Sequence, residues 1–157
     1  MKGIFSVLVE NKSGVLSQIS GLFARRGFNI DSLAVGETER HDISSMTIVS
    51  TGDQRVIDQI EKQLNKKIDV IKVRRLDEAK TISLEMMLIK VAYNPQNRQG
   101  LIELCSMAGA KIMHVAPKHA VIELHSTPDS IENFIELARP YGILEIQRTG
   151  TISLEKK

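Results

Sequence analysis

One order of elements, strand-helix-strand-strand-helix-strand, runs twice through this chain of 157 residues. In the first half, apolar β-rich runs predict strands at 3–9, 29–36, 43–50 and 68–76. Apolar residues take helical spacing from Val15 and again after Asp53. Gly27 follows Arg25 and Arg26, and a glycine behind basic residues is typical of a helix C-terminus.

The second half repeats this order behind a short polar stretch. Its strands are predicted at 82–92, 110–116, 119–125 and 143–149. Gly109 ends the first helix of this half, and Pro128 suits the first position of the second helix. Two such copies predict an α+β fold made of two ferredoxin-like βαββαβ sandwiches in tandem. The expected divisions are a first domain at 1–76, a linker at 77–81 and a second domain at 82–157.

A sandwich of this kind leaves one face of its sheet without helices. The first strand alternates Phe5, Val7 and Val9 with Ile4, Ser6 and Leu8. Both faces of this strand are therefore largely apolar, and an uncovered apolar face favours association. We expect a homodimer in which the N-terminal sheets or first helices meet and cover Phe5 and Val7. The alternative is that the other half of the same chain covers the open face.

Composition excludes several classes of partner. The chain has 21 basic and 19 acidic residues, a net charge of +2, which argues against a nucleic-acid partner. Aromatic residues make up 4% and tryptophan is absent, so side chains for base stacking are scarce. No stretch approaches the roughly 20 apolar residues of a spanning helix, so no membrane partner is expected. The single cysteine, Cys105, excludes an internal disulfide and makes a reducing cytoplasm the expected compartment.

No set of acid, base and nucleophile stands out along the chain. Cys105 lies on the apolar stripe of a predicted helix, as an inert buried thiol would. Neither a Gly-rich phosphate loop nor a serine nucleophile elbow is present. The histidines lack metal-site spacing, although His114 and His125, in strands beside a tight turn, leave a transition-metal site open. We therefore expect no catalytic residue, no metal and a non-enzymatic role.

The turn at residues 10–16, between the first strand and the first helix, is the exception. Gly14 lets a ligand approach the backbone closely, and Ser13 is the predicted N-cap. The first N–H groups of a helix lack intrahelical partners and lie at the positive end of the helix dipole, so they suit a carboxylate. Asn11 can both donate and accept, which allows it to read either charged group of an amino acid.

Asn29, at the start of the second predicted strand, offers another polar contact because that strand is expected to pair with or lie next to the first. An apolar wall is expected from Val9, Leu16 and Val35. Polar groups for a head group and aliphatic groups for a side chain predict a small aliphatic amino acid as the ligand. Asparagine and glycine are also ordinary turn residues, so a plain helix cap is the alternative.

The same residues carry a resemblance to a known family. The run Phe5–Leu16 resembles the start of an ACT domain. Its continuation, Ile19–Leu33, is similar to the small regulatory subunit of acetohydroxyacid synthase, also called acetolactate synthase. Further segments that fit this family are Met46–Ile48, Ile60–Lys66 and Met87–Val91. The resemblance covers almost the whole chain and is looser from about residue 93, with its largest departure at Tyr93–Arg98.

The resemblance implies a regulatory subunit that binds and activates a separate catalytic subunit. Thiamine diphosphate, Mg and FAD are then expected only in that partner, which condenses pyruvate with pyruvate or 2-oxobutyrate, and no cofactor is expected in this chain. It also implies feedback inhibition by a branched-chain amino acid, usually valine, with leucine and isoleucine as alternatives. The effector is expected between two ACT domains of a homodimer. The expected effector-binding residues are Asn11, Ser13, Gly14, Val15, Leu16, Asn29, Ile30 and Val35.

Three other function classes compete with this interpretation. A free-standing ACT-type amino-acid sensor that regulates transcription would need a DNA-binding element, and no helix-turn-helix pattern is present. A free-standing ACT-type sensor that regulates another enzyme is the main alternative. An RNA-binding module would carry aromatic residues on its central strands, where the strand at 43–50 has Met46 and Ile48 instead. A small enzyme of unrecognised type is disfavoured by the missing catalytic set.

Overall fold

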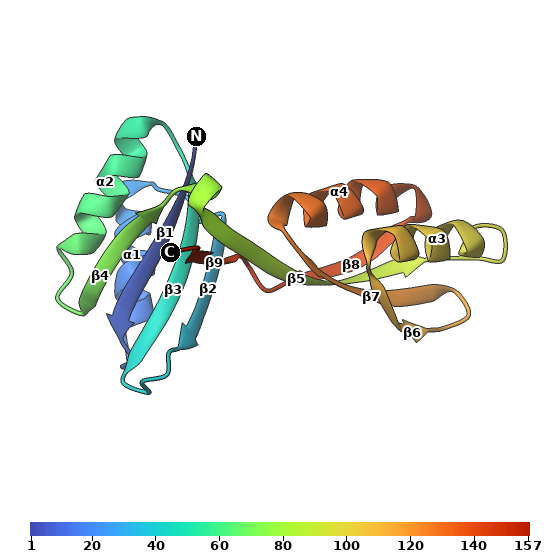
Figure 1. Ribbon diagram of the computed structural model, residues 1–157, viewed down its shortest axis with the longest axis horizontal. Helices are drawn as coiled ribbons and strands as arrows, with labels where there is room; N and C mark the ends of the chain where they lie inside the picture. The colour runs from blue at the N-terminus through green and yellow to red at the C-terminus, as the bar shows by residue number, and fades with distance from the viewer. The chain divides into compact units, whose positions relative to one another are not determined.

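The computed structural model describes residues 1–157 as two compact units, each with the predicted order of elements (Figure 1). Met1–Ser83 and Thr151–Lys157 form the first unit, and Leu84–Gly150 form the second. The first contains β1 (Lys2–Glu10), α1 (Val15–Arg26), β2 (Ser32–Glu37), β3 (Ile43–Thr51), α2 (Gln54–Asn65), β4 (Val70–Leu76) and the 3-10 helix η1 (Glu78–Lys80). After it come β5 (Thr81–Ala92), α3 (Arg98–Ala108), β6 (Lys111–Val115), β7 (His119–Ser126), α4 (Pro128–Ala138), the 3-10 helix η2 (Arg139–Tyr141), β8 (Ile143–Arg148) and β9 (Ile152–Glu155).

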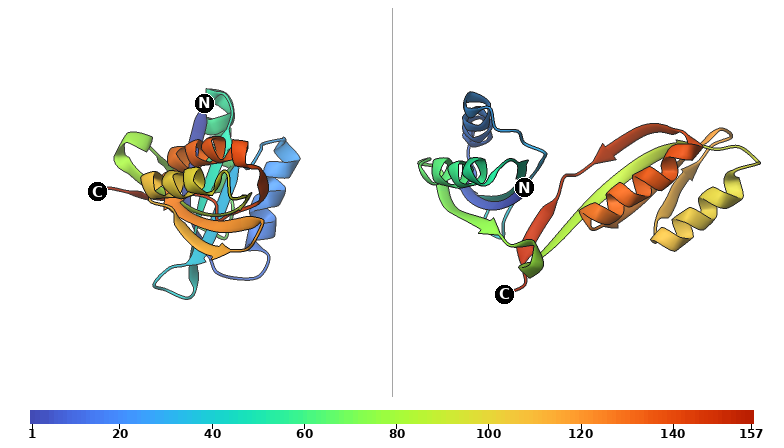
Figure 2. Two further views of the ribbon diagram at one scale, coloured as in Figure 1. Left: turned by 90° about the vertical axis from the view of Figure 1, so that its right-hand side faces the viewer. Right: turned by 90° about the horizontal axis from the view of Figure 1, so that it is seen from above.

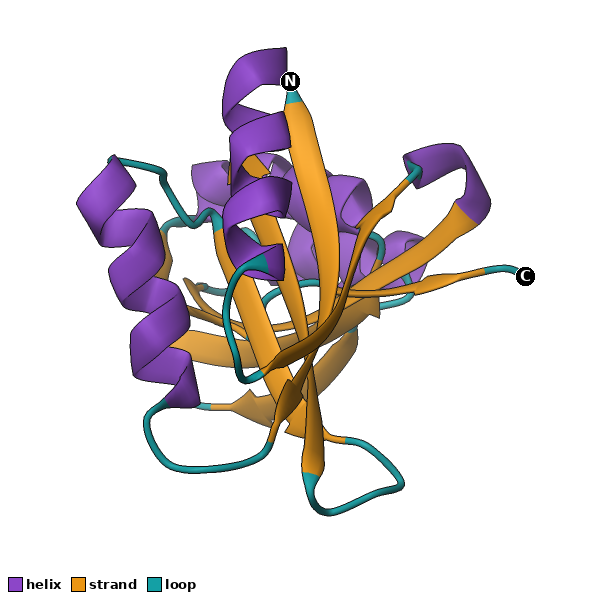
Figure 3. Cartoon of the chain, turned by 90° about the vertical axis from the view of Figure 1, so that its left-hand side faces the viewer, coloured by secondary structure: helices purple, strands orange, loops and turns teal.

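In the first unit, α1 and α2 cover one face of a four-stranded antiparallel sheet with the order β2-β3-β1-β4 (Figure 3). Phe5 and Val7 of β1 point to this face and are fully buried with Phe23 of α1 and Ile57 of α2. The predicted α+β sandwich is confirmed. The expectation that Phe5 and Val7 need a second copy to cover them is wrong, because the helices of their own chain already do so.

The ends of the helices follow local backbone chemistry. Asp53 accepts a hydrogen bond from the N–H of Val56 at 2.8 Å and caps α2. Gly27 ends α1 in the left-handed conformation, with φ of 68°. The prediction of Ser13 as the N-cap of α1 is wrong. Gly14 holds that position with φ of 88°, and no side chain caps the helix.

The strand β9 was not predicted, and it belongs to the first unit. Figure 1 shows it on the side of the sheet away from α1 and α2. Its backbone is fixed there because Thr151 N–H donates to Ser32 Oγ at 2.8 Å and Ser153 N–H donates to Thr47 Oγ1 at 3.3 Å. The last residues of the chain therefore pack with the first unit, whereas the sequence placed them in a second domain at 82–157.

The helix-free face of the first sheet is thus partly covered by its own chain. Ile4, Val49 and Leu76 form a separate buried cluster, each no more than 6% exposed. The alternative, in which the other half of the same chain covers this face, holds only for β9, which the sequence placed in that half.

In the second unit, α3 and α4 lie on one face of a sheet with the order β6-β7-β5-β8 (Figure 2). Its core holds Met87, Ile89, Ile122 and Phe134, all nearly inaccessible to solvent. Gly109 ends α3 with φ of 70°, and Pro128 begins α4, both as predicted.

One ion pair ties the ends of the second unit together. The side chain of Glu85 on β5 is only 3% exposed and meets the Arg148 guanidinium of β8 through both of its oxygens. Arg148 also contacts Glu132 of α4 at 2.6 Å. These acceptors raise the pKa of Arg148, with Glu85 as the main cause. Because a buried carboxylate without a partner is costly, this pair constrains how β5 and β8 align.

None of the helices has the length and apolar character that crossing a bilayer requires.

Candidate functional site

The turn between β1 and α1 presents unpaired backbone donors. The N–H groups of Gly14, Leu16 and Ser17 have no hydrogen-bond partner, and that of Val15 makes only a 3.5 Å contact with the carbonyl of Lys12. Since no side chain caps the helix, these donors and the positive end of the helix dipole face outward together. A carboxylate is the group that such an arrangement suits best.

Gly14 keeps this helix start open. A β-carbon built at position 14 would have no heavy atom within 4 Å, so the space in front of the backbone is free. The φ of 88° is one that side-chain-bearing residues rarely adopt. Glycine therefore permits the turn and leaves the space in front of the helix open.

Asn11 is already oriented by the protein around it. Its Nδ2 donates to Glu37 Oε1 at 3.1 Å and to the His41 carbonyl at 2.8 Å. Both amide hydrogens are used in this way, so Oδ1 is the atom left for a ligand. An oxygen acceptor a short distance from free N–H donors fits the ammonium and the carboxylate of an α-amino acid.

Lys12 joins this turn to the segment that precedes β4. Its Nζ lies 2.8 Å from Asp69 Oδ1 and 2.9 Å from Glu10 Oε2. These contacts raise the pKa of Lys12, chiefly through Asp69, and the hydrogen bond from Lys12 lowers the pKa of Asp69. The turn is consequently fixed on one side by an ion pair and on the other by the amide of Asn11.

The expected apolar residues differ in how accessible they are. Leu16 and Val35 are each 47% exposed and available for contact. Val35 pairs with Met46 in the sheet and so points to the helix-covered face, at the open edge of β2. Val15 is only 3% exposed and packs in the core, so it offers a ligand only its backbone. Ile30 is half-buried against the same core.

The expectation that the second strand lies next to the first is wrong, because β3 separates β2 from β1. Asn29 also lies at the opposite end of the sheet from Asn11. Its carbonyl accepts from Ser50 Oγ, and Ser50 pairs with Gly3 at the start of β1. Asn11 follows Glu10 at the end of β1. Seven residues of strand, at roughly 3.3 Å each, separate the two asparagines by about 23 Å. One amino acid cannot reach both within one chain, and a shared site needs a second copy.

The other residues singled out in the sequence are not brought together. Cys105 is 3% exposed, and burial raises the pKa of its thiol, as expected for an inert cysteine. The ring of His114 lies near that of His119, with centroids 6.4 Å apart, whereas His125 meets Glu123 at 2.9 Å. His114 and His125 therefore do not converge on one point.

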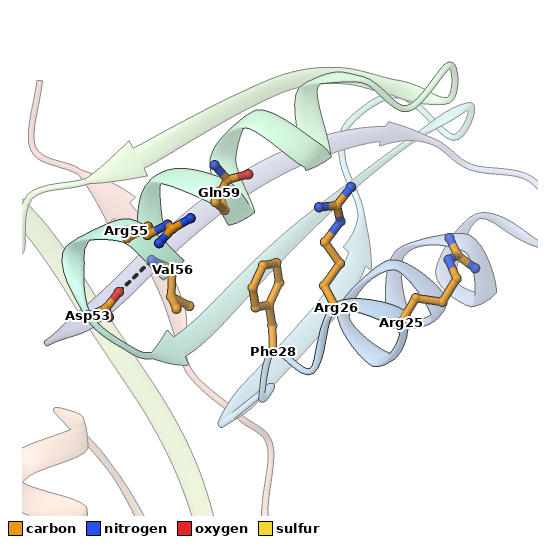
Figure 4. A pocket seen from close by; sticks show the side chains of 7 residues that line it. All are labelled: Arg25, Arg26, Phe28, Asp53, Arg55, Val56 and Gln59. Carbon is orange, nitrogen blue, oxygen red and sulfur yellow. Dashed lines mark hydrogen bonds between the residues drawn. The ribbon is translucent and has the colours of Figure 1, made fainter.

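A second surface feature was not predicted. A depression of about 690 Å³ lies between the end of α1 and the start of α2 and is lined by Arg25, Arg26, Phe28, Asp53, Arg55, Val56 and Gln59 (Figure 4). We call it the arginine basin. The sequence shows its arginines only as dispersed charges on helix ends, because the contact between α1 and α2 that gathers them is tertiary.

Comparison with known proteins places these features in a family. Residues 5–72 match the family model described as an AHAS small subunit-like ACT domain, and residues 84–157 match the small subunit of acetolactate synthase. The chain is 47% identical to a probable acetolactate synthase small subunit of Archaeoglobus fulgidus, over 98% of this chain and 96% of the relative. It is 45% identical to the acetolactate synthase small subunit of Mycolicibacterium smegmatis, over 96% and 89%.

A solved structure agrees with these matches. The crystal structure of the acetolactate synthase small subunit from Thermotoga maritima superposes with a TM-score of 0.90 and is 37% identical in sequence. The match covers 100% of this chain and 98% of that one. The tandem fold and the family resemblance inferred from the sequence are both confirmed.

Proposed function

Because the chain belongs to the family of acetolactate synthase small subunits, in which catalysis resides in the large subunit, we propose that it binds and activates that large subunit and makes it sensitive to valine. Leucine and isoleucine are the related candidate effectors. This chain then needs no cofactor of its own, and thiamine diphosphate, Mg and FAD belong to the catalytic partner.

The open start of α1 is the observation that carries the sensing role. The free N–H groups of Gly14 and Leu16 suit the carboxylate of an amino acid, and the unused Oδ1 of Asn11 suits its ammonium. Leu16 and Val35, both half exposed, supply aliphatic surface for a branched side chain. A small aliphatic amino acid satisfies all of these groups together.

The two-copy site follows from the edge strand β2. When two β2 strands pair antiparallel about a twofold axis, the Ser32 end of one lies beside the Glu37 end of the other. Asn29 precedes Ser32, and Asn11 donates to Glu37. Asn29 of one copy is thereby brought towards the Asn11 turn of the other. We propose this homodimer, with two effector sites related by the twofold axis.

Reconstitution with the cognate catalytic subunit tests this function. The full chain is added to that subunit, and acetolactate formation from pyruvate is followed with and without valine. We expect no activity from the chain alone, a higher rate on its addition, and inhibition by valine only when it is present. A rate that does not respond to the chain would contradict the proposal, and would favour a sensor of another enzyme.

A further inference from the structure

We propose that the arginine basin is a docking site for an acidic segment of the catalytic subunit, an inference that rests on the proposed regulatory function. The basin lies between α1 and α2 of the first unit, at their Arg26 and Arg55 ends (Figure 4). It shares no residue with the proposed effector site, and its Phe28 directly precedes Asn29 of that site in the chain.

The charge of the basin is uncompensated within the chain. The arginines that form ion pairs are Arg40, Arg74, Arg75, Arg139 and Arg148. Arg25, Arg26 and Arg55 form none, although all three line the same depression. The only carboxylate there, Asp53, is engaged as the cap of α2. Three arginines with one engaged carboxylate give the depression a positive charge, which suits an acidic partner.

The floor of the basin is apolar, which distinguishes it from a plain solvated face. Phe28 and Val56 are half-buried, and Figure 4 shows them between Arg26 on one side and Arg55 on the other. The Phe28 ring packs edge-on against the core residue Phe23, with centroids 6.2 Å apart, so its position is fixed. A fixed aromatic floor with an arginine rim is the composition enriched at protein interfaces.

The openness of the basin favours a macromolecular occupant over a small anion. Sites for small ligands enclose most of the ligand surface, whereas Arg25, Arg26 and Arg55 all stand exposed around a broad depression. An acidic segment that also carries an apolar side chain can bring the guanidinium groups its carboxylates and cover Phe28. Bidentate carboxylate pairing is the chemistry that arginine serves best.

Charge reversal tests the assignment. The double variant Arg26→Glu with Arg55→Glu is compared with Lys62→Glu with Lys66→Glu, which reverses two exposed, unpaired lysines at the other end of α2. Affinity for the cognate catalytic subunit is measured without valine, and thermal unfolding verifies that both variants are folded. We expect the arginine variant to bind roughly 30-fold more weakly or worse, and the lysine control to bind like wild type. Added NaCl should weaken the wild-type complex more than that of the arginine variant.

The possible results distinguish a failure of the docking assignment from a failure of the proposed regulatory function. If wild type binds and the arginine variant binds equally well, the docking assignment is overturned while the regulatory function stands. If wild type does not bind the catalytic subunit, both are overturned. Calorimetric titration of the isolated chain with inorganic phosphate tests whether the basin binds a small anion instead. If the arginine variant no longer binds phosphate but still binds the catalytic subunit, the docking assignment is also overturned.

Discussion

The two halves share one fold but close the turn before their first helix in different ways. In the second half, Asn94 Oδ1 accepts from the N–H groups of Gln96 at 2.9 Å and Asn97 at 3.0 Å. In return, Asn97 Oδ1 accepts from the N–H of Asn94 at 2.8 Å. The N–H groups of Asn94, Gln96 and Asn97 are thereby satisfied by side chains of the turn itself, although no side chain caps α3. In the first half, the N–H of Gly14, which holds the same N-cap position as Asn97, has no such partner.

The start of α1 also has more free space around it than the start of α3. A β-carbon at Gly100, in the first turn of α3, would stand 2.7 Å from the Tyr141 hydroxyl. A β-carbon at Gly14 would meet nothing within 4 Å. The repeated fold therefore does not in itself create a binding site. The start of α1 is open in front of Gly14, whereas Tyr141 covers the first turn of α3.

The largest effect is expected from Gly14→Asp, which closes the open turn. The new carboxylate occupies the approach of the ligand and repels its carboxylate, so valine affinity should fall by roughly 100-fold or more. Calorimetric titration of valine measures this. Gly14→Asn is the matched control, because asparagine tolerates the left-handed backbone and has the same size without the charge. Equal valine affinity in the aspartate variant and wild type would show that this turn does not bind valine and only begins the helix.

Stability should respond most to Arg148→Met in the second half. This change leaves Glu85 charged and nearly inaccessible, at a cost of about 3 kcal/mol in the free energy of unfolding. The control Arg139→Met removes an exposed pair with Glu136 and should cost under about 0.5 kcal/mol. Urea unfolding measures both. Valine affinity should not change in either variant, and a loss in Arg148→Met would show that the halves are not separate in function.

A smaller loss is expected from Asn29→Ala. Removing one hydrogen bond to a charged ligand costs about 1.5–3 kcal/mol, which is one to two decades in valine affinity. Asn65→Ala serves as the control, since Asn65 only donates to the Glu61 carbonyl on α2. The two variants should unfold at similar temperatures. Indistinguishable valine affinities would remove Asn29 from the site.

The smallest effect is expected on the free energy of unfolding at acidic pH, to which the Lys12–Asp69 ion pair beside the first turn contributes. The pKa of Asp69 is lower in the folded state than its ordinary value of about 3.9. Its ionised form thus stabilises the fold above that pH, and this contribution is lost as the pH falls through the lower folded value. Asp69→Asn should therefore flatten the loss of stability below about pH 4. An unchanged pH profile of unfolding would contradict the ion pair.

Most of the fold could be predicted because it is encoded locally. Apolar spacing located the four α-helices and eight of the nine strands to within a few residues, and Gly27, Gly109 and Pro128 marked helix ends. The strand β9 was missed because it is short and its partners, such as Thr47, lie about a hundred residues earlier in the chain. Its alternating sequence from Ile152 to Glu155 was the available signal.

The candidate site could be predicted only in part for a similar reason. The composition of the turn indicated Asn11 and Gly14, since both lie within a few residues of one another. Ser13 looked like a cap because its residue type favours that role, yet the left-handed Gly14 begins the helix. The distance between Asn11 and Asn29 depends on strand order, and the arginine basin depends on helix packing. Neither can be predicted from the spacing of residues that are close in sequence.

Mixing two defective variants tests most directly whether the effector site is built from two copies. Chains carrying Gly14→Asp are unfolded and refolded together with chains carrying Asn29→Ala, and high-affinity valine sites are counted by calorimetry. In a mixed dimer, the intact turn of one copy meets the intact Asn29 of the other. The account predicts that roughly a quarter of the wild-type number of sites returns, because random pairing makes half the dimers mixed and each regains one site of two. No gain over either variant alone would contradict it and confine the site to a single chain.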